Sequence, residues 1–362
     1  MVRKSKLPSG PKAKPVKPSK TTKGAVVKET PVTPPAPPTV STELQQKSLN
    51  IFRDALDPSS EDSNTTLQEV KGHLFNRDFA AAFGKEEYLR VYAGRWSPSR
   101  ALGYTQILLD VQDLIASGKS DVDDDEEPPF RVLCIGGGAG AELVALATWA
   151  SLEDTPFPRL QAKFLDIAAW GPVVTALHDA VTNAPPLSQY ASAAAKEANE
   201  PLLLPDAFKV TFQQQDALEI TDNEHCQQFF GSNDLITMMF TLNELYSTSL
   251  AKTQQMLARV TASCRPGTIL LVVDSPGSYS TVSMNGAEKK YPMQWLLDFT
   301  LIGPPKKDLG GAEGSVKWEK LLEDESRWYR LPPGLKYPIE LENMRYQIHI
   351  YRRLGASAVV ET

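Results

Sequence analysis

The sequence predicts an α/β fold built on a mostly parallel sheet, and three features of its 362 residues predict it. From residue 128 to residue 277, short apolar runs alternate with helical runs, the pattern of right-handed βαβ units. Four glycines follow the first apolar run within five positions, 136–140. The last run, 342–354, alternates in polarity, which predicts one antiparallel strand added to the parallel sheet.

Residues 1–40 are predicted to form a disordered, basic, Pro-rich tail. Residues 1–28 hold nine Lys or Arg and no Asp or Glu, whereas the remaining residues hold 29 basic and 44 acidic side chains. Ordering this segment would cost conformational entropy that no apolar burial returns. The tail therefore predicts nuclear import or contact with nucleic acid, with a solubilising leader as the alternative.

Residues 41–127 are predicted to form a helical prelude, or cap, that ends in an acidic linker. Apolar residues such as Leu49, Phe52 and Leu56 recur at helical spacing. Ser97 is a good N-cap and Pro98 suits the first turn, so a helix is predicted to begin there. Six carboxylates within 121–127 predict a solvated linker.

Residues 128–362 are predicted to form the main domain, with a C-terminal substrate-binding insertion at 278–340. The predicted strands are 130–136, 159–167, 209–218, 234–245, 266–277 and 342–354. The predicted helices are 141–152, 170–184, 249–264 and 291–301, with an Ala/Pro-rich insertion at 184–207 and a loop at 304–316.

Composition argues against several classes of protein. The three cysteines are far apart and form no CxxC pair, so we expect neither a disulfide framework nor a thiolate zinc site. The four histidines show no metal-ligand spacing. No apolar run reaches the roughly 20 residues that a membrane span needs. We therefore expect a soluble intracellular protein without a metal site or membrane partner; the sequence carries no signal for an oligomeric state.

The glycine-rich turn predicts a site where a ligand approaches the backbone. Glycine removes the side chain that would block such an approach, and the following helix offers free N–H groups to an acidic ligand. Gly136-x-Gly138-x-x-Ala141 fits a dinucleotide loop, while Gly136-x-Gly138-x-Gly140 fits an S-adenosylmethionine (SAM) loop. The loop alone leaves both cofactors open.

Two acidic residues at strand ends favour SAM. Asp166 ends the second predicted strand, where it could accept hydrogen bonds from ribose hydroxyls. Asp216 ends the third predicted strand, where it could accept a hydrogen bond from the adenine amino group. A dinucleotide would give Asp216 no role, and the antiparallel final strand also favours a methyltransferase sheet over a dehydrogenase sheet.

At this point the chain resembles the class I SAM-dependent methyltransferases, which have a Rossmann-like sheet. The resemblance implies that the loop cradles the methionine part of SAM, that Asp166 holds the ribose and that Asp216 holds the adenine. The implied cofactor contacts are Gly136, Gly137, Gly138, Gly140, Asp166, Asp216, Ala217 and Thr241. One departure is Cys134, which stands where the family often has an acidic residue, so a carboxylate contact from that position is missing.

Four stretches are similar to a fungal family of large-subunit (25S) ribosomal RNA methyltransferases that modify uridine N3. They are VLCIGGGAGAELVALA, LDIAAW, MMFTLNELYS and SRWYRLPPGLKYPIELENMRYQIHIYRR, and the resemblance spans residues 70–355. It implies a large-subunit rRNA or pre-ribosomal particle as partner, and a nuclear or nucleolar location with the cytoplasm as a second one. The alternatives are a protein or small-molecule methyltransferase on the same fold, a non-catalytic ribosome-assembly factor, and a nicotinamide oxidoreductase.

Methylation of uracil N3 requires removal of its imide proton, which a carboxylate near the acceptor could accept. Glu244, in the loop after the fourth predicted strand, is the first candidate base, with Asn243 orienting the pyrimidine edge. Asp274 after the fifth strand is the second candidate. The alternative is that Asn243 caps the next helix while Glu244 faces solvent.

RNA contacts are predicted in the segments outside the cofactor sheet. The candidates are Arg95, Trp96 and Arg100 in the prelude and Trp328 and Arg345 in the C-terminal part. Tryptophan can stack on a splayed base and arginine can bind phosphate, although core packing is the alternative for both tryptophans. A base within a duplex would first have to flip out. Because the body is net acidic, either the tail supplies the attraction or a particle presents the RNA.

Overall fold

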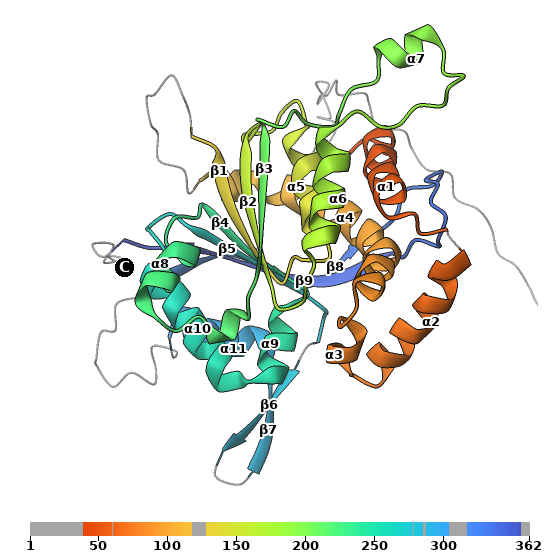
Figure 1. Ribbon diagram of the computed structural model, residues 1–362. Helices are drawn as coiled ribbons and strands as arrows, with labels where there is room; N and C mark the ends of the chain where they lie inside the picture. Colours follow the sequence, from red (N-terminus) through yellow and green to blue (C-terminus); the bar gives the residue numbers. More distant parts are fainter. Residues whose placement is uncertain are drawn as a thin grey trace, which may run out of the picture. The chain divides into compact units, whose positions relative to one another are not determined.

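A seven-stranded sheet lies at the centre of the computed structural model, in the order β3–β2–β1–β4–β5–β9–β8 (Figure 1). The structure describes residues 39–59, 61–117, 128–277, 279–284, 287–303 and 317–355, so most of the tail, the acidic linker and the predicted loop 304–316 lie outside it. The strands of the sheet are β1 (Phe130–Ile135), β2 (Leu160–Asp166), β3 (Phe208–Gln214), β4 (Leu235–Met239), β5 (Ile269–Asp274), β8 (Trp318–Tyr329) and β9 (Met344–Arg353).

Strand directions confirm a mostly parallel sheet with an antiparallel C-terminal strand. Strands β1 to β5 run parallel, and β9 pairs antiparallel with both β5 and β8. The alternating polarity of 342–354 predicts a strand with one face exposed, and this is wrong, because β9 lies between β5 and β8 and most of its residues are buried. Strands β2 and β3 are added on one side of β1, whereas β4 and β5 are added on its other side, so the strand order reverses between β1 and β4. Such switch points place a ligand crevice at the carboxyl ends of the strands.

Helices cover both faces of the sheet. Along β1, Val132 and Cys134 pack into one apolar cluster, whereas Leu133 and Ile135 pack into another on the opposite face. Burial on both faces explains why the predicted strands are continuous apolar runs. The first face carries α5 (Ala141–Ala150) and α6 (Gly171–Thr182), and the second carries α8 (Asn223–Phe230), α10 (Leu250–Ser263) and α11 (Met293–Leu301) (Figure 1).

The N-terminal helices lie on the same face as α5 and α6. They are α1 (Thr42–Leu56), α2 (Glu61–Phe75), α3 (Phe79–Ala82) and α4 (Glu86–Ala116). Leu49 and Phe52 of α1 are fully buried in the cluster that also holds Leu143 of α5. Burying each such side chain contributes about 1.5–3 kcal/mol, so these helices are part of the core.

Helix α4 corrects the prediction of a new helix at Ser97, because it runs unbroken from Glu86 to Ala116 with Pro98 inside it. Proline lacks the N–H that would bond the carbonyl four residues earlier, here that of Gly94. The hydroxyl of Tyr337 donates to this carbonyl instead, at 2.8 Å. A tertiary contact therefore replaces the missing helical hydrogen bond, and local sequence rules could not foresee it.

The fourth strand is shorter than predicted. β4 ends at Met239 rather than at residue 245, and α9 (Leu242–Thr248) follows at once. Phe240 ends the strand because its φ of 59° leaves the extended region. The remaining elements are α7 (Ala193–Glu197), the 3₁₀ helix η1 (Ala217–Glu219) and the hairpin of β6 (Tyr279–Met284) and β7 (Ala287–Pro292).

The residues that the structure describes, from 39 to 355 with the gaps given above, belong to one compact unit. The predicted domain boundaries, 1–40, 41–127 and 128–362, stay predictions, and so does the substrate-binding insertion at 278–340. Within the predicted insertion, Trp318–Tyr329 forms strand β8 of the main sheet. Among the helices that the structure describes, none is long and apolar enough to cross a membrane.

Candidate active site

The glycine loop is a tight turn between β1 and α5. Gly136 and Gly140 have positive φ angles of 78° and 80°, which residues with a Cβ adopt at a cost. Gly140 donates its N–H to the carbonyl of Gly137 at 3.1 Å and is the N-cap residue of α5. The turn therefore delivers the N-terminus of α5 to the switch point of the sheet.

The loop glycines admit side chains from neighbouring strand ends. A Cβ on Gly136 would lie 2.3 Å from Oγ1 of Thr241, which follows β4. A Cβ on Gly138 would lie 2.1 Å from Cδ1 of Trp170, which precedes α6. The structure thus brings the predicted cofactor residue Thr241 against the loop, and it adds Trp170, which the sequence analysis missed.

Asp166 is fixed against the same loop. Its Oδ2 accepts the N–H of Gly138 at 3.0 Å and its Oδ1 accepts the N–H of Ala168 at 3.1 Å. Burial raises the pKa of Asp166, while the hydrogen bonds from the backbone of Ala168 and Gly138 oppose that rise. The Trp170 side chain and the Ile167 backbone also donate to this carboxylate, so the Asp166 side chain is held in place at the end of β2.

The end of β3 is less clearly built for a ligand. Oδ1 of Asp216 accepts the N–H of Leu218 at 2.9 Å and so caps η1, and Ala217 is buried. Their contact with adenine stays a prediction. Ile167 was missed: it is an apolar residue directly after Asp166, yet 65% of its surface is exposed. An exposed apolar side chain beside Asp166 offers a surface for a base, and its position in the sequence could have revealed it.

A further carboxylate, missed by the sequence analysis, lies beneath the glycine loop. Glu142, in the first turn of α5, is only 4% exposed. It accepts a hydrogen bond from the hydroxyl of Thr237 at 2.5 Å. A Cβ on Gly137 would lie 2.7 Å from Oε2 of Glu142 and 2.8 Å from Cβ of Cys134. Helix α5 thus places a carboxylate beside Cys134, where the strand itself lacks one.

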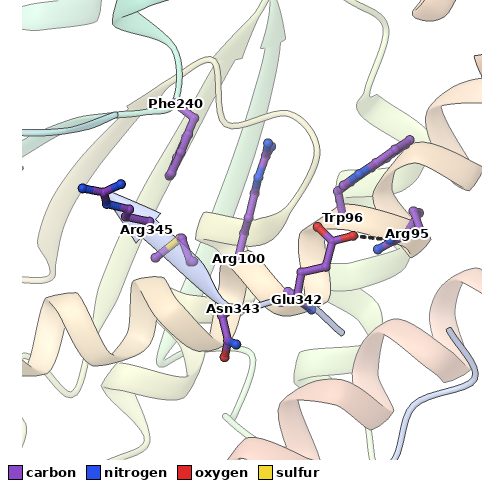
Figure 2. A pocket seen from close by; sticks show the side chains of 9 residues that line it. Arg95, Trp96, Arg100, Phe240, Glu342, Asn343 and Arg345 are labelled. Carbon is purple, nitrogen blue, oxygen red and sulfur yellow. Dashed lines mark hydrogen bonds and ion pairs between the residues drawn. The ribbon is translucent and has the colours of Figure 1, made fainter. Parts of the chain in front are cut away.

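The glycine loop and the residues packed against it form the candidate cofactor half of the site. Beside it lies a pocket of about 170 Å³ (Figure 2). It brings four of the five predicted RNA residues together, from helix α4 and strand β9. Its lining residues are Arg95, Trp96, Ser99, Arg100, Phe240, Glu342, Asn343, Met344 and Arg345.

Arg100 lies between Phe240 and Trp96 in the pocket (Figure 2). Its Cζ is 5.2 Å from the centre of the Phe240 ring, and its Nη1 donates to the hydroxyl of Tyr92 at 3.3 Å. The positive φ of Phe240 is unusual for a bulky residue, and such backbone strain clusters at functional sites. Phe240 was missed because no local sequence rule reports its φ angle.

The other predicted RNA residues differ in how free their side chains are to contact RNA. Arg95 forms an ion pair with Glu342, so its charge is already matched. Trp328 is 50% exposed on β8. The guanidinium carbons of Arg330 and Arg345 lie 3.9 Å and 5.7 Å from the Trp328 ring centre. Trp328 is therefore a surface residue flanked by two cations, and core packing does not account for it.

Asp274 and Glu244 occupy different environments. Asp274 is 3% exposed, and its carboxylate accepts the N–H of Asn243 at 3.0 Å and that of Ser275 at 2.7 Å. Burial raises the pKa of Asp274 to about 6, the charge of Glu244 adds to the rise, and Arg100 opposes it. Glu244 itself is exposed on α9. Asn243 contacts Asp274 through its backbone, so its proposed role with the pyrimidine edge stays a prediction.

Helix α4 joins the two halves of the site. The Ser97 hydroxyl donates to the carbonyl of Ala139 in the glycine loop at 2.6 Å. The neighbouring Trp96 lines the pocket and lies 4.7 Å, ring centre to ring centre, from Tyr92. Tyr92 in turn lies 5.8 Å from Trp170. The described residues include no group of three or more His, Cys, Asp or Glu that could hold a metal ion.

Comparisons with known proteins identify the family of the chain. A family model described as a SAM-dependent methyltransferase matches residues 52–352. The 25S rRNA (uridine(2843)-N(3))-methyltransferase of Saccharomyces cerevisiae is 34% identical over 337 residues, which cover 86% of this chain and 86% of the yeast protein.

Solved structures are more distant. A SAM-dependent methyltransferase of Methanosarcina mazei is 13% identical, with a TM-score of 0.33, covering 63% of this chain and 94% of its own. Human N-acetylserotonin methyltransferase, solved in complex with SAM, is 12% identical, with a TM-score of 0.34, covering 86% of this chain and 72% of its own.

Proposed function

Because this chain belongs to the family of SAM-dependent methyltransferases, we propose that it transfers a methyl group from SAM to N3 of a uridine in large-subunit ribosomal RNA. The substrate follows the yeast relative, whose name specifies uridine N3 of 25S rRNA. The nicotinamide oxidoreductase alternative is set aside by the family match.

The residues around the glycine loop fit this cofactor. Backbone N–H groups of Gly138 and Ala168 hold Asp166 against the glycine loop, where it is the candidate partner of the ribose, and Ile167 exposes an apolar surface beside it. Because Gly138 has no side chain, the Trp170 ring and the Asp166 carboxylate can approach the loop backbone closely. When bound there, SAM supplies an electrophilic methyl group on a sulfonium, so the protein needs to position the acceptor nitrogen and remove its proton.

The pocket beside the loop suits an extruded base. Phe240 and Trp96 offer flat apolar surfaces on either side of Arg100, and stacking on aromatic rings is the usual way in which proteins hold an unpaired base. Arg100 carries a charge that can stabilise a uracil oxygen as N3 loses its proton. Arg345 at the rim can meet a backbone phosphate.

The observation that carries the uridine assignment is the 34% identity to the yeast enzyme over 86% of this chain. The buried carboxylate of Asp274, whose charge interacts with that of Arg100 in the pocket, supports Asp274 as the proton acceptor. A base must be ionised before it accepts a proton, and a pKa of about 6 leaves Asp274 mostly ionised at pH 7 yet more basic than an ordinary Asp. Glu244, the first choice from sequence, is exposed on α9. We therefore assign the proton acceptor to Asp274 and keep Glu244 as the competing assignment.

The RNA partner is proposed to be a pre-ribosomal particle in the nucleus or nucleolus, with the cytoplasm as a second location. Residues 29–362 hold 29 basic and 44 acidic side chains, a net charge of −15, which disfavours unaided binding of a polyanion by the body of the protein. The basic residues of 1–28 would supply the long-range attraction, and they lie outside the described residues.

The test is complementation of a yeast strain that lacks its 25S rRNA uridine-N3 methyltransferase. We expect the full chain to restore N3-methyluridine, measured by mass spectrometry of rRNA digests. Asp274→Asn should abolish the modification and Glu244→Gln should retain it, while both variants still bind S-adenosylhomocysteine. The reverse result for the two variants would assign the base to Glu244. If the wild-type chain restores no methyluridine, the uridine assignment is wrong.

Ribosome maturation separates an enzyme from an assembly factor in the same strain. The Asp274→Asn protein is expected to support normal large-subunit levels in sucrose gradients while leaving the rRNA unmodified. A loss of subunits together with persistent methylation would favour a scaffold role instead.

A further inference from the structure

Glu142 is a buried carboxylate in the cofactor half of the site to which the reaction above assigns no role. Cys134 of β1 and Thr237 of β4 are register partners on adjacent strands, so their side chains share one face of the sheet. The side chain of Glu142, in the first turn of α5, contacts both residues of this pair. The helix and two strands therefore converge on one carboxylate directly below Gly137.

The partners of Glu142 are neutral. Its Oε1 accepts the Thr237 hydroxyl, and its Oε2 lies on the side of the glycine-loop backbone, 2.7 Å from where a Cβ on Gly137 would be. In the part of the chain that the structure describes, no ion pair includes Glu142. A buried carboxylate is costly unless a cation meets it or it takes up a proton.

The ligand itself carries the cation that this carboxylate lacks. The resemblance to class I methyltransferases implies that the glycine loop receives the methionine portion of SAM, which bears a positively charged α-ammonium group. We propose that Glu142 is the anionic partner of this ammonium group and that it releases a proton to solvent when the cofactor binds. The inference rests on the SAM-dependent reaction proposed above, and it assigns to α5 the carboxylate that Cys134 does not provide.

Proton release follows from the electrostatics around Glu142. Burial raises its pKa to about 7, and the charge of Asp166 on β2 adds to the rise. The other titratable groups that face it are Cys134 on β1 and Tyr104 on α4, and burial raises the pKa of both well above its usual value. These two groups stay neutral between pH 6 and pH 8, so Glu142 is the group beneath the loop that changes charge near neutrality.

The cofactor should therefore bind more tightly as pH rises. A group with a pKa of about 7 that must be ionised in the complex strengthens binding about tenfold between pH 6 and pH 8. It also releases about 0.9 proton per binding event at pH 6 and about 0.1 at pH 8. An isosteric Glu142→Gln variant keeps an oxygen for the Thr237 hydroxyl but has no charge to offer.

The experiment is titration calorimetry of the full chain with S-adenosylhomocysteine, in pairs of buffers that differ in ionisation enthalpy. We expect proton release at pH 6 in the wild type and none in Glu142→Gln, whose affinity should be pH-independent and at least tenfold weaker at pH 8. Asp274→Asn is the matched control, because Asp274 is the other buried carboxylate with a pKa near neutrality, and it should release protons like the wild type. The second probe, 5′-methylthioadenosine, lacks the ammonium group and should release none.

Several outcomes would overturn the inference. Equal proton release by the wild type and Glu142→Gln would place the titrating group elsewhere, and release with 5′-methylthioadenosine would detach it from the ammonium group. Absence of release from the wild type at pH 6 would refute the linkage, and absence of S-adenosylhomocysteine binding would refute the site itself. The uridine assignment stands or falls separately, on the methyluridine content of rRNA.

Discussion

Replacing Glu142 by Gln is expected to stabilise the cofactor-free protein at neutral and alkaline pH. A carboxyl group whose pKa is higher in the folded state than in the unfolded state binds its proton more tightly when folded. Its contribution to the free energy of unfolding is therefore neutral below the unfolded pKa. It becomes increasingly destabilising as pH rises toward the folded pKa and is constant above it. For Glu142 these limits are a pKa of 4.5 and a pKa of about 7.

The magnitude follows from the difference between the two pKa values. At 1.36 kcal/mol for each unit, the ionised form of Glu142 costs about 3 kcal/mol of folding free energy above pH 7. Gln removes this cost because it cannot ionise, and its amide oxygen can still accept the Thr237 hydroxyl. We therefore expect Glu142→Gln and the wild type to be about equally stable near pH 4.5, and the variant to be more stable by about 3 kcal/mol at pH 8.

Urea denaturation at several pH values measures this difference. Other groups with shifted pKa values, such as Asp274, contribute equally to both proteins and cancel in the comparison. Glu244→Gln is the control, because Glu244 is an exposed carboxylate and its removal should bring no comparable gain. A Glu142→Gln protein that is equally stable at pH 8, or less stable, would refute the reasoning that a buried, unpaired carboxylate lies under the loop.

Three further substitutions test other contacts. Gly138→Ala should lower the melting temperature and abolish S-adenosylhomocysteine binding in calorimetry, because its Cβ would lie 2.1 Å from the buried Trp170; wild-type affinity would contradict this. Tyr337→Phe leaves the carbonyl of Gly94 without its donor and should cost about 1–3 kcal/mol in urea denaturation; a cost below about 0.5 kcal/mol would count against it. Trp328→Ala should weaken binding of a large-subunit rRNA fragment, measured by fluorescence anisotropy, without changing cofactor affinity; unchanged RNA binding would remove Trp328 from the interface.

The sequence predicted the parallel part of the sheet well for a physical reason. Strands with apolar neighbours on both faces read as continuous apolar runs, and β1, predicted as 130–136, spans Phe130–Ile135. Strand β8 was missed because it lies at the sheet edge, where half of its surroundings are solvent. Its sequence WEKLLEDESRWY is therefore dominated by charged residues and resembles a surface segment.

In the candidate site, too, some residues could be predicted from the sequence and others could not. Gly138 and Asp166 could be predicted because each follows a strand, and the carboxyl ends of neighbouring parallel strands meet in space. Glu142 could not, because its role depends on which side of α5 faces β1 and β4. The preference for Asp274 over Glu244 depends on burial, which the sequence of a strand-to-helix loop does not specify.

The wrong prediction about Ser97 has the clearest functional meaning. If a helix began at Ser97, the helical backbone would be interrupted between Trp96 and Ser97. In the structure, Trp96 lines the pocket and the Ser97 hydroxyl donates a hydrogen bond to Ala139 in the glycine loop, so two successive residues of one continuous helix contact the two halves of the site. Methyl transfer requires donor and acceptor to be aligned, and a displacement of 1 Å can cost about a hundredfold in rate. Pro98 would weaken the helix at this point, and the Tyr337 hydroxyl restores it from the C-terminal segment. The segment before β9 thus helps to hold the spacing between the two halves of the site.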